Sequence, residues 1–298
     1  ATLLIGSLLA IRQTDLKLML AYTTVSSLGL MVMMTGFGSE HAAAAGVLYL
    51  VAHSMFKGAL FMLAGNIDHE SGTRDITRLG GLRKLMPISF LAAMAAALSM
   101  GGLPPFFGFL SKEEIYYGLW HMDAWSVLFV LVAIVGNGLM FVIGFAIAIK
   151  PFLGKEVETP KHAHEAPFLM WIGPATLATG GFLAAVLSPL FHRFVSSPMV
   201  SAVTGRPEEI TISLLPHIGM PLLLSLITIV FAVLVYLKLD AARAAIAATL
   251  AAIGWGPDRG FDQFISGTVR LSRRVTKFVQ PGQLDIYMTA TFAAVAIT

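Results

Sequence analysis

The chain contains no cysteine and few charged residues. Of its 298 residues only 12% are Asp, Glu, Lys or Arg, against about 25% in soluble domains. The absence of cysteine excludes disulfides, thiolate metal sites and cysteine nucleophiles. The formal charge of +3 is small for this length and does not favour a nucleic-acid partner. The Ser, His and acidic residues form no nucleophile motif, so the sequence favours a role other than that of an enzyme.

Long apolar runs dominate the chain instead. Hydrophobic residues make up 56% of it, and the mean hydropathy is +0.78. A run of about twenty apolar residues is long enough to cross a bilayer as a helix. The sequence therefore predicts an all-α, polytopic transmembrane helix bundle within a lipid bilayer. Its complete spans, about seven by this length criterion, are expected near residues 18–37, 42–66, 87–103, 104–122, 124–149, 167–190 and 216–238.

Both ends of the chain carry shorter apolar segments. Residues 1–11 are too few to span a membrane, and residues 284–298 begin like a spanning helix but stop after about fifteen residues. No secretory signal is visible at the start. We therefore expect an internal piece of a longer protein, with a transmembrane domain over 1–238, an interfacial amphipathic segment over 239–283 and the start of a truncated membrane helix over 284–298.

A basic amphipathic stretch occupies residues 257–279. Phenylalanine, isoleucine and valine residues mark one loose face, and five basic residues supply charge, namely Arg259, Arg270, Arg273, Arg274 and Lys277. This pattern is typical of a helix that lies on a membrane surface. The alternative is a plain connector whose basic side chains reach the headgroups in the ordinary way.

A lysine lies midway along the apolar run 46–65. A charge in the middle of a membrane helix costs on the order of 3 kcal/mol, so Lys57 is a candidate for proton or ion movement. His53 precedes it by one helical turn and lies on the same face. The predicted helix 42–66 contains no carboxylate, so an ion-pair partner would have to come from another helix. A structural ion pair at Lys57 and a hydrogen-bonded core histidine at His53 are the alternatives.

Two consecutive prolines mark a second candidate site, in the run 101–115. Pro104 and Pro105 interrupt helical hydrogen bonding, and Lys112 follows about two turns later. Transporters often place ion paths at such helix breaks. Lysine and histidine suit proton relay, since burial disfavours the charged form of lysine and histidine titrates near neutrality. The alternative is a plain turn between two helices, with Lys112 close to the surface.

One polar loop contains a pair of histidines, His162 and His164. Two histidines can bind a metal ion, but a single pair in a polar loop is a weak indication. We predict no metal site here and no cofactor.

Three ordered motifs resemble a known family. The strings DLKLMLAYTTVSSLG (15–29), HSMFKGALFMLAG (53–65) and GLPPFFGFLSKE (102–113) are similar to the second half of the antiporter-like subunits shared by respiratory complex I and Mrp-type cation/proton antiporters. Within that family, GNIDHESGTRD (65–75) and LGGLRKLMP (79–87) most closely resemble the large A subunit of the Mrp antiporters.

The resemblance implies roles for four residues. Lys57 would be the lysine of a central hydrophilic axis, with His53 beside it. Lys112 would lie on a discontinuous helix near one proton exit, and Lys17 would be a further polar site in the path. The family also carries a glutamate and lysine pair on earlier helices, which this sequence does not contain.

The function implied by the resemblance is that of a proton-translocating subunit in a multisubunit antiporter. The expected exchange is of protons for a monovalent cation, with sodium as the expected ion, beside other subunits of a complex in a bacterial cell membrane. One alternative is a proton-pumping subunit of complex I or of a membrane-bound hydrogenase. The segment 239–283 is too short for the long lateral helix of complex I, which favours the Mrp type. The other alternative is a structural scaffold subunit whose lysines only form ion pairs.

Overall fold

The computed structural model describes residues 1–298 except 121–125, 213, 215–218, 255, 281 and 298. In the described part of the chain the regular secondary structure is helical, and one isolated bridge joins Asp15 and Asp75. The predicted all-α class is confirmed. The chain divides into two compact units, Ala1–Ala244 and Ala245–Thr298.

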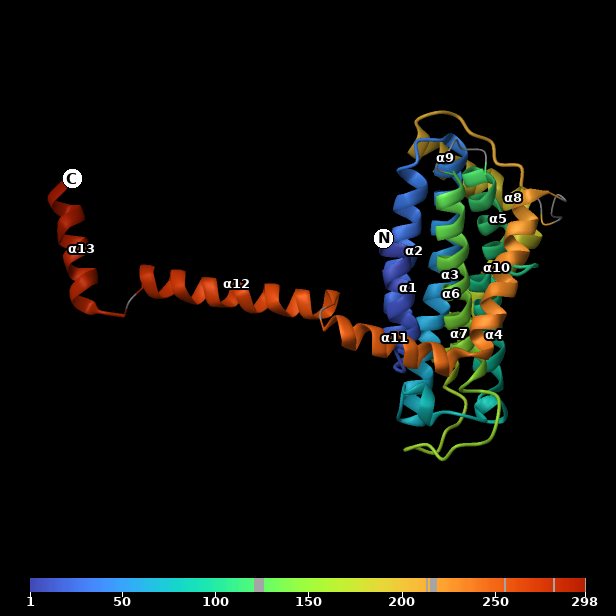
Figure 1. The fold of residues 1–298 in the computed structure, drawn as a ribbon, viewed down its shortest axis with the longest axis horizontal. Helices are drawn as coiled ribbons and strands as arrows, with labels where there is room; N and C mark the ends of the chain where they lie inside the picture. Colours follow the sequence, from blue (N-terminus) through green and yellow to red (C-terminus); the bar gives the residue numbers. More distant parts are fainter. Residues whose placement is uncertain (121–125, 213, 215–218, 255, 281, 298) are drawn as a thin grey trace. The chain divides into compact units, whose positions relative to one another are not determined.

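The first unit is a bundle of helices that run side by side (Figure 1). The bounds of its helices are α1 Thr2–Arg12, α2 Leu16–Thr35, α3 Glu40–Ser71, α4 Pro87–Gly101, α5 Phe107–Trp120, α6 Ser126–Ile149, α7 Phe168–Val186, α8 Ser188–Phe191, α9 Ser197–Thr204 and α10 Met220–Leu237. Short 3-10 turns occupy Ile76–Arg78 and Leu82–Lys84, and a π-helical turn occupies His192–Ser196. Among the described residues, α2, α3, α6, α7 and α10 have the length and apolar composition to cross a membrane, as a multi-pass membrane protein requires.

Two of the predicted spans fold as shorter helices. α4 has 15 residues and α5 has 14, whereas a membrane crossing needs about 20. α4 ends at Gly101 and is followed by Gly102, whose φ is 75°, and α5 begins only after the Pro104–Pro105 pair. The ranges 87–103 and 104–122 therefore form a discontinuous helix in two pieces. The parts of the predicted spans at 121–122, 124–125 and 216–218 lie outside the described residues.

The limits of α3 are set by residues that cap it. The Ser39 side chain accepts a hydrogen bond from the backbone N–H of Ala42 at 3.1 Å, which satisfies one of the free donors at the start of a helix. At the other end Gly72 adopts φ 76°, a left-handed conformation that glycine takes without steric cost. α3 therefore has 32 residues and extends beyond the predicted span 42–66 at both ends.

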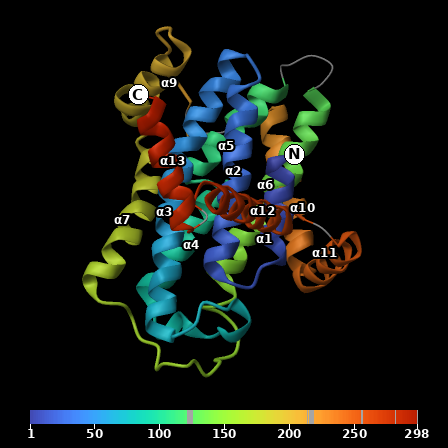
Figure 2. The same ribbon diagram turned by 90° about the vertical axis from the view of Figure 1, so that its left-hand side faces the viewer.

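α3 lies at the centre of the bundle. It packs against α2, α4, α5 and α7, and α6 packs against α4 and α10 (Figure 2). Its buried face is largely apolar, with Phe56, Leu60 and Leu63 fully enclosed. His53 and Lys57 lie within this face. The core of the bundle thus surrounds the two polar residues that the sequence marks on this helix.

The second unit contains the C-terminal part of α11 (Leu239–Ile253), α12 (Pro257–Val279) and α13 (Leu284–Ile297). α12 has 23 residues and is helical along the whole predicted amphipathic stretch. α13 has 14 residues and is apolar.

Candidate functional site

Lys57 lies in the interior of the bundle. Its side chain is 4% exposed, and Nζ donates a hydrogen bond to the backbone carbonyl of Leu20 at 2.9 Å and a second one to Thr23 Oγ1. Both acceptors belong to α2 and are neutral. Because an isolated buried charge is strongly disfavoured, an ammonium group held only by neutral oxygens is poorly stabilised. The position suits a group that changes its protonation state.

The carbonyl oxygen of Leu20 is shared by several donors. Thr23 Oγ1 lies 3.0 Å and Thr24 Oγ1 2.9 Å from it, and Thr23 Oγ1 is also 3.0 Å from the carbonyl of Met19. A hydroxyl has one proton, so Thr23 can donate to one of these carbonyls while it accepts from Lys57. This part of α2 therefore offers neutral groups that can exchange hydrogen-bond partners beside the amine.

The helix of Lys57 does contain carboxylates, so that expectation from the sequence is wrong. Glu40, Asp68 and Glu70 lie near its ends, because the capping residues and not the limits of the apolar run set the length of α3. Asp68 is about three turns from Lys57 and pairs with Lys17 instead. The ion pairs among the described residues do not include Lys57.

His53 lies one turn before Lys57 on the same face of α3. Its side chain is 8% exposed, its ring packs edge-on against Phe56 with 5.5 Å between ring centroids, and the Tyr49 ring is 6.1 Å away. Nε2 is buried without a hydrogen-bond partner among the described residues. Since buried polar atoms are nearly always paired, this nitrogen is a candidate for proton exchange.

Lys112 binds the broken end of α4. Its side chain is 3% exposed, and Nζ donates a hydrogen bond to the carbonyl of Met100 at 2.7 Å. In an unbroken helix that carbonyl would accept from the N–H four residues later, but Pro104 has none. The lysine supplies the missing donor, and its charge is favourable at a helix C-terminus. The structure thus places Lys112 in the interior and not close to the surface.

Two glycines allow the pieces of the broken helix to meet. A Cβ atom at Gly108 would lie 1.8 Å from the carbonyl oxygen of Ser99, and a Cβ atom at Gly102 would lie 2.5 Å from Cδ of Lys112. Gly102 also has a positive φ of 75°. Neither glycine was predicted from the sequence as a functional residue, although both belong to the motif 102–113.

Further polar groups are buried beside Lys112. Tyr116, one turn later on α5, has its hydroxyl 2.5 Å from Thr228 Oγ1 on α10, and Asn137 Nδ2 on α6 donates to the same hydroxyl at 3.5 Å. Asn137 Oδ1 is buried without a partner among the described residues. These three residues were not predicted from the sequence, although Asn137 is an amide within the apolar run 124–149.

Side-chain contacts between two hydroxyls and a thioether join α2, α3 and α6. Ser27 Oγ lies 3.1 Å from the hydroxyl of Tyr49, and Met140 Sδ lies 3.3 Å from the former and 3.7 Å from the latter. Tyr49 is one turn before His53. Buried polar side chains therefore occur on α2, α3, α5, α6 and α10, around the central helix.

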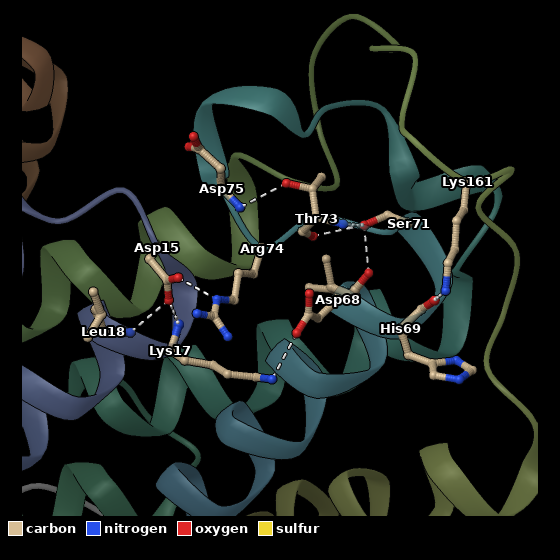
Figure 3. Close-up of polar contacts among 11 residues, drawn as sticks. Asp15, Lys17, Leu18, Asp68, His69, Ser71, Thr73, Arg74, Asp75 and Lys161 are labelled. Carbon is tan, nitrogen blue, oxygen red and sulfur yellow. Dashed lines mark hydrogen bonds and ion pairs between the residues drawn. The ribbon is translucent and has the colours of Figure 1, made fainter.

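Lys17 lies apart from this interior group. Its Nζ is 2.9 Å from Asp68 Oδ2, and the two side chains are 39% and 33% exposed. Figure 3 shows this pair beside the ion pair of Asp15 with Arg74 at the start of α2. The structure thus brings His53 and Lys57 together on α3, holds Lys112 at the helix break, and leaves Lys17 at a half-exposed end of the bundle.

The loop 150–166 uses its polar residues to hold two helix ends. His164 Nε2 lies 3.2 Å from one carboxylate oxygen of Glu70, and His69 Nδ1 lies 3.0 Å from the other. Glu165 accepts hydrogen bonds from two backbone N–H groups and one hydroxyl at the start of α4. In the described ranges, groups of three or more His, Cys, Asp or Glu that could hold a metal ion do not occur.

An acidic cavity lies at the end of α3 that is remote from Asp68. It has a volume of about 660 Å³, and its lining includes five carboxylates and one histidine, namely Glu40, His41, Glu113, Glu114, Glu208 and Glu209. Glu40 pairs with Arg206, and His41 lies 4.0 Å from Glu114, but carboxylates are the commonest charged groups in the lining. A hollow in which negative groups predominate raises the local concentration of cations. This cavity was not predicted from the sequence, because its acidic residues come from three separate segments that only the fold brings together.

The N-terminal part of the chain matches a known protein family. The family model described as "NADH:quinone oxidoreductase/Mrp antiporter, TM" matches residues 1–138. The A subunit of the Na(+)/H(+) antiporter of Bacillus subtilis (strain 168) is 33% identical to this chain over an alignment of 323 residues. The alignment includes 99% of this chain. The chain spans 40% of the length of that relative.

Solved structures contain the same fold. A chain in the structure of the Mrp complex from Dietzia sp. DQ12-45-1b matches 100% of this chain with a TM-score of 0.77 and 27% identity, and 33% of its own length is covered. A chain of respiratory complex I from Thermus thermophilus matches 68% of this chain with a TM-score of 0.55 and 25% identity, over 42% of its length. The predicted fold, a transmembrane bundle with a discontinuous helix, is confirmed.

Proposed function

Because the chain belongs to the family of antiporter-like membrane subunits shared by NADH:quinone oxidoreductases and Mrp antiporters, we propose that it acts as a proton-translocating part of a multisubunit monovalent cation/proton antiporter. Sodium is the proposed cation, since the Bacillus subtilis relative is named as part of a Na(+)/H(+) antiporter. The proposed partners are other subunits of such a complex, and the proposed location is a bacterial cell membrane. The likeness to a chain of the Dietzia Mrp complex supports this choice.

The proposal rests mainly on two lysines that are buried and have only neutral hydrogen-bond acceptors. The ammonium groups of Lys57 and Lys112 are almost completely enclosed and donate to neutral oxygens. A buried cation without a counter-charge is easily converted to the neutral amine, and an amine can take up the next proton. This alternation is what a proton relay needs, whereas a scaffold lysine would be expected to pair with a carboxylate.

The arrangement of the side chains suggests an order for the relay. A proton on Lys57 passes to His53, one turn along α3, and from there to Lys112 on α5, which packs against α3. Each transfer moves one proton from a nitrogen to the next, so that donor and acceptor exchange charge and nothing is consumed. Water fills the gaps between these side chains in the proposed path. Lys17 and its partner Asp68 form the proposed polar site at one end.

A second candidate function is that of a proton-pumping subunit in a respiratory complex. The likeness to complex I from Thermus thermophilus favours it. The same lysines and histidine would then relay protons, but electron transfer in partner subunits would drive the movement and no cation would be exchanged.

Proton flux in membrane vesicles tests the proposal. Everted vesicles that carry the whole parent complex are energised, and a dye reports the internal acidity while sodium is added. The variants are Lys57→Ala and Lys112→Ala, and Lys155→Ala, in an exposed loop, is the matched control. We expect sodium to dissipate the gradient in the wild type and in the control but not in the two buried variants, with assembly unchanged on native gels.

Three other results would contradict the proposal in different ways. Flux that is indifferent to both buried lysines would remove them from the path. Loss of the assembled complex in both variants would support the scaffold role. Flux that requires an electron donor such as NADH and ignores sodium would support the respiratory role.

A further inference from the structure

The last part of the loop between α6 and α7, residues 159–165, lies along the end of α3 as a strap. The backbone N–H of Lys161 donates a hydrogen bond to the carbonyl of Ser71 at 3.0 Å. Lys161 Nζ donates to the carbonyl of His69 at 3.0 Å, and Figure 3 shows this side chain reaching the last turn of α3. At its other end the strap binds the start of α4 through Glu165. The strap therefore connects the end of α3 to the first piece of the discontinuous helix.

His164, in this strap, lies between two hydrogen-bond acceptors. Its Nε2 is 3.2 Å from Oε2 of Glu70, and its Nδ1 is 3.0 Å from the backbone carbonyl oxygen of Glu165. A carbonyl and an ionised carboxylate accept hydrogen bonds and donate none. A neutral imidazole carries one N–H and can bind only one of these oxygens, whereas an imidazolium carries two and binds both. The geometry at His164 therefore fits the protonated ring.

The carboxylate that His164 contacts is buried. The side chain of Glu70 is 5% exposed, and its other oxygen lies 3.0 Å from Nδ1 of His69. A buried carboxylate is costly unless it is paired and hydrogen-bonded, so the loss of either contact is unfavourable. The side chain of His164 is 67% exposed, so its ring exchanges protons with water. A ring that is accessible to solvent thus controls the pairing of a buried charge.

Other charged groups at this end of the bundle have partners of their own. Lys17 of α2 pairs with Asp68, and Arg74 pairs with Asp15. Arg83 lies over an aromatic ring of α4, with 5.7 Å from its guanidinium carbon to the ring centroid. Histidine is the side chain whose charge changes between about pH 5 and about pH 8. The two rings on the buried carboxylate are therefore the groups that make this contact depend on pH.

We propose that the strap is a pH-sensitive latch, held on Glu70 when His164 is protonated and released from α3 as the pH rises through the histidine range. When His164 loses its proton to water, one of its ring nitrogens faces an acceptor without an N–H, and one of the two contacts is given up. The positive charge beside the buried carboxylate disappears in the same step. The latch is therefore closed at low pH and open at high pH. Because Glu165 is the next residue, opening also loosens the start of α4, and this effect does not depend on the proton relay.

Hydrogen–deuterium exchange of the whole parent complex in nanodiscs tests the latch. The measured groups are the amide of Lys161, which binds α3, and the amides of Ile88 and Ser89, which bind Glu165. Exchange is compared at about pH 5 and about pH 8, with labelling times corrected for the intrinsic effect of pH. In the wild type we expect roughly threefold greater protection at the lower pH, as the loss of one hydrogen bond implies.

Three substitutions assign the effect to particular residues. His164→Gln removes the titrating ring and is expected to abolish the difference between the two pH values. His162→Gln is the matched control and is expected to keep the difference, because this exposed ring lies two residues earlier in the strap and the rings that contact Glu70 are those of His69 and His164. Glu70→Gln removes the carboxyl charge and supplies an N–H for a neutral ring, so the strap is expected to stay protected at both pH values.

Equal protection of the wild type at both pH values would overturn the proposal. A difference that persists in His164→Gln would overturn it as well, because the titrating group would then lie elsewhere. If Glu70→Gln loses protection throughout α3, that variant is misfolded. The comparison of His164→Gln with His162→Gln then decides, since both of these side chains are exposed.

Discussion

Replacing Gly108 with alanine tests whether the helix break positions Lys112. The new Cβ atom would lie 1.8 Å from the carbonyl oxygen and 2.6 Å from the carbonyl carbon of Ser99. Both are backbone atoms of α4 and cannot rotate away. Since real Cβ atoms do not approach closer than about 3 Å to such atoms, α5 must move by about 1 Å or more relative to α4.

The cost of this movement has two parts. Overpacking of a close contact costs about 1–3 kcal/mol. Lys112 lies one turn after Gly108, so the same shift lengthens its 2.7 Å bond to Met100 beyond hydrogen-bond range and leaves a buried carbonyl without a partner. An unsatisfied buried acceptor costs a further 1–3 kcal/mol or so. We expect a destabilisation of about 2–6 kcal/mol together with loss of proton flux.

The measurements are thermal unfolding of the purified protein in detergent and sodium-dependent proton flux in vesicles. Gly180→Ala is the matched control, because Gly180 also lies inside a helix and a Cβ atom there would meet nothing within 4 Å. The control is expected to unfold at the wild-type temperature or slightly above it, since alanine favours helix over glycine by about 1 kcal/mol. If Gly108→Ala matches the control in unfolding temperature and in flux, α4 and α5 are not closely packed at the break and do not position Lys112.

Three further predictions concern polar contacts made with the ends of helices. Glu165→Ala is expected to lower the free energy of unfolding by about 1–2 kcal/mol, because Glu165 binds the free N–H groups of α4, and thermal unfolding measures the loss. Lys17→Ala is expected to lower the free energy of unfolding by less than about 1 kcal/mol, because the ion pair of Lys17 with Asp68 is half exposed. A proton flux as low as that of Lys57→Ala would show that Lys17 is as important to the path as the buried lysine. Hydrogen bonding from Lys150 holds the pKa of Asp240 below the usual carboxyl range. The ion pair therefore makes its small contribution to stability at pH values above the usual carboxyl pKa, and this contribution is lost as the pH falls through the lowered pKa of Asp240. Unfolding temperatures of wild type and Asp240→Asn are expected to converge towards low pH, and a constant difference between them would refute the ion pair.

The sequence was sufficient to predict the long membrane helices α2, α3, α6, α7 and α10, because hydrophobic length is a one-dimensional property; it did not show that 87–103 and 104–122 are two shorter pieces. The central lysine was predictable for the same reason, since a charge within an apolar run is visible without any knowledge of the fold. The prolines at 104 and 105 marked the break correctly. They could not show that Lys112 turns back to the carbonyl of Met100, because that contact depends on how the two helix pieces meet.

The length of α3 and the surroundings of its polar residues were harder to predict. Local side-chain and backbone geometry at Ser39 and Gly72 extended the helix past the apolar run and brought carboxylates into it. Asn137 and Tyr116 belong to different helices, and only packing brings the amide to the hydroxyl. The acidic cavity depends on three segments that are distant in sequence, so a linear pattern contains no trace of it.

The uninterrupted α3 has a mechanical consequence. Its 32 residues make a rod of about 48 Å, whereas the apolar layer of a membrane is about 30 Å thick. The excess length of about 18 Å requires that α3 is tilted in the membrane or that its ends project into water. The ends that contain Glu40 and Asp68 are the parts best suited to project. α3 contains no proline between these two ends, so the helix has no hinge there. A displacement of either water-exposed end therefore moves Lys57 as well.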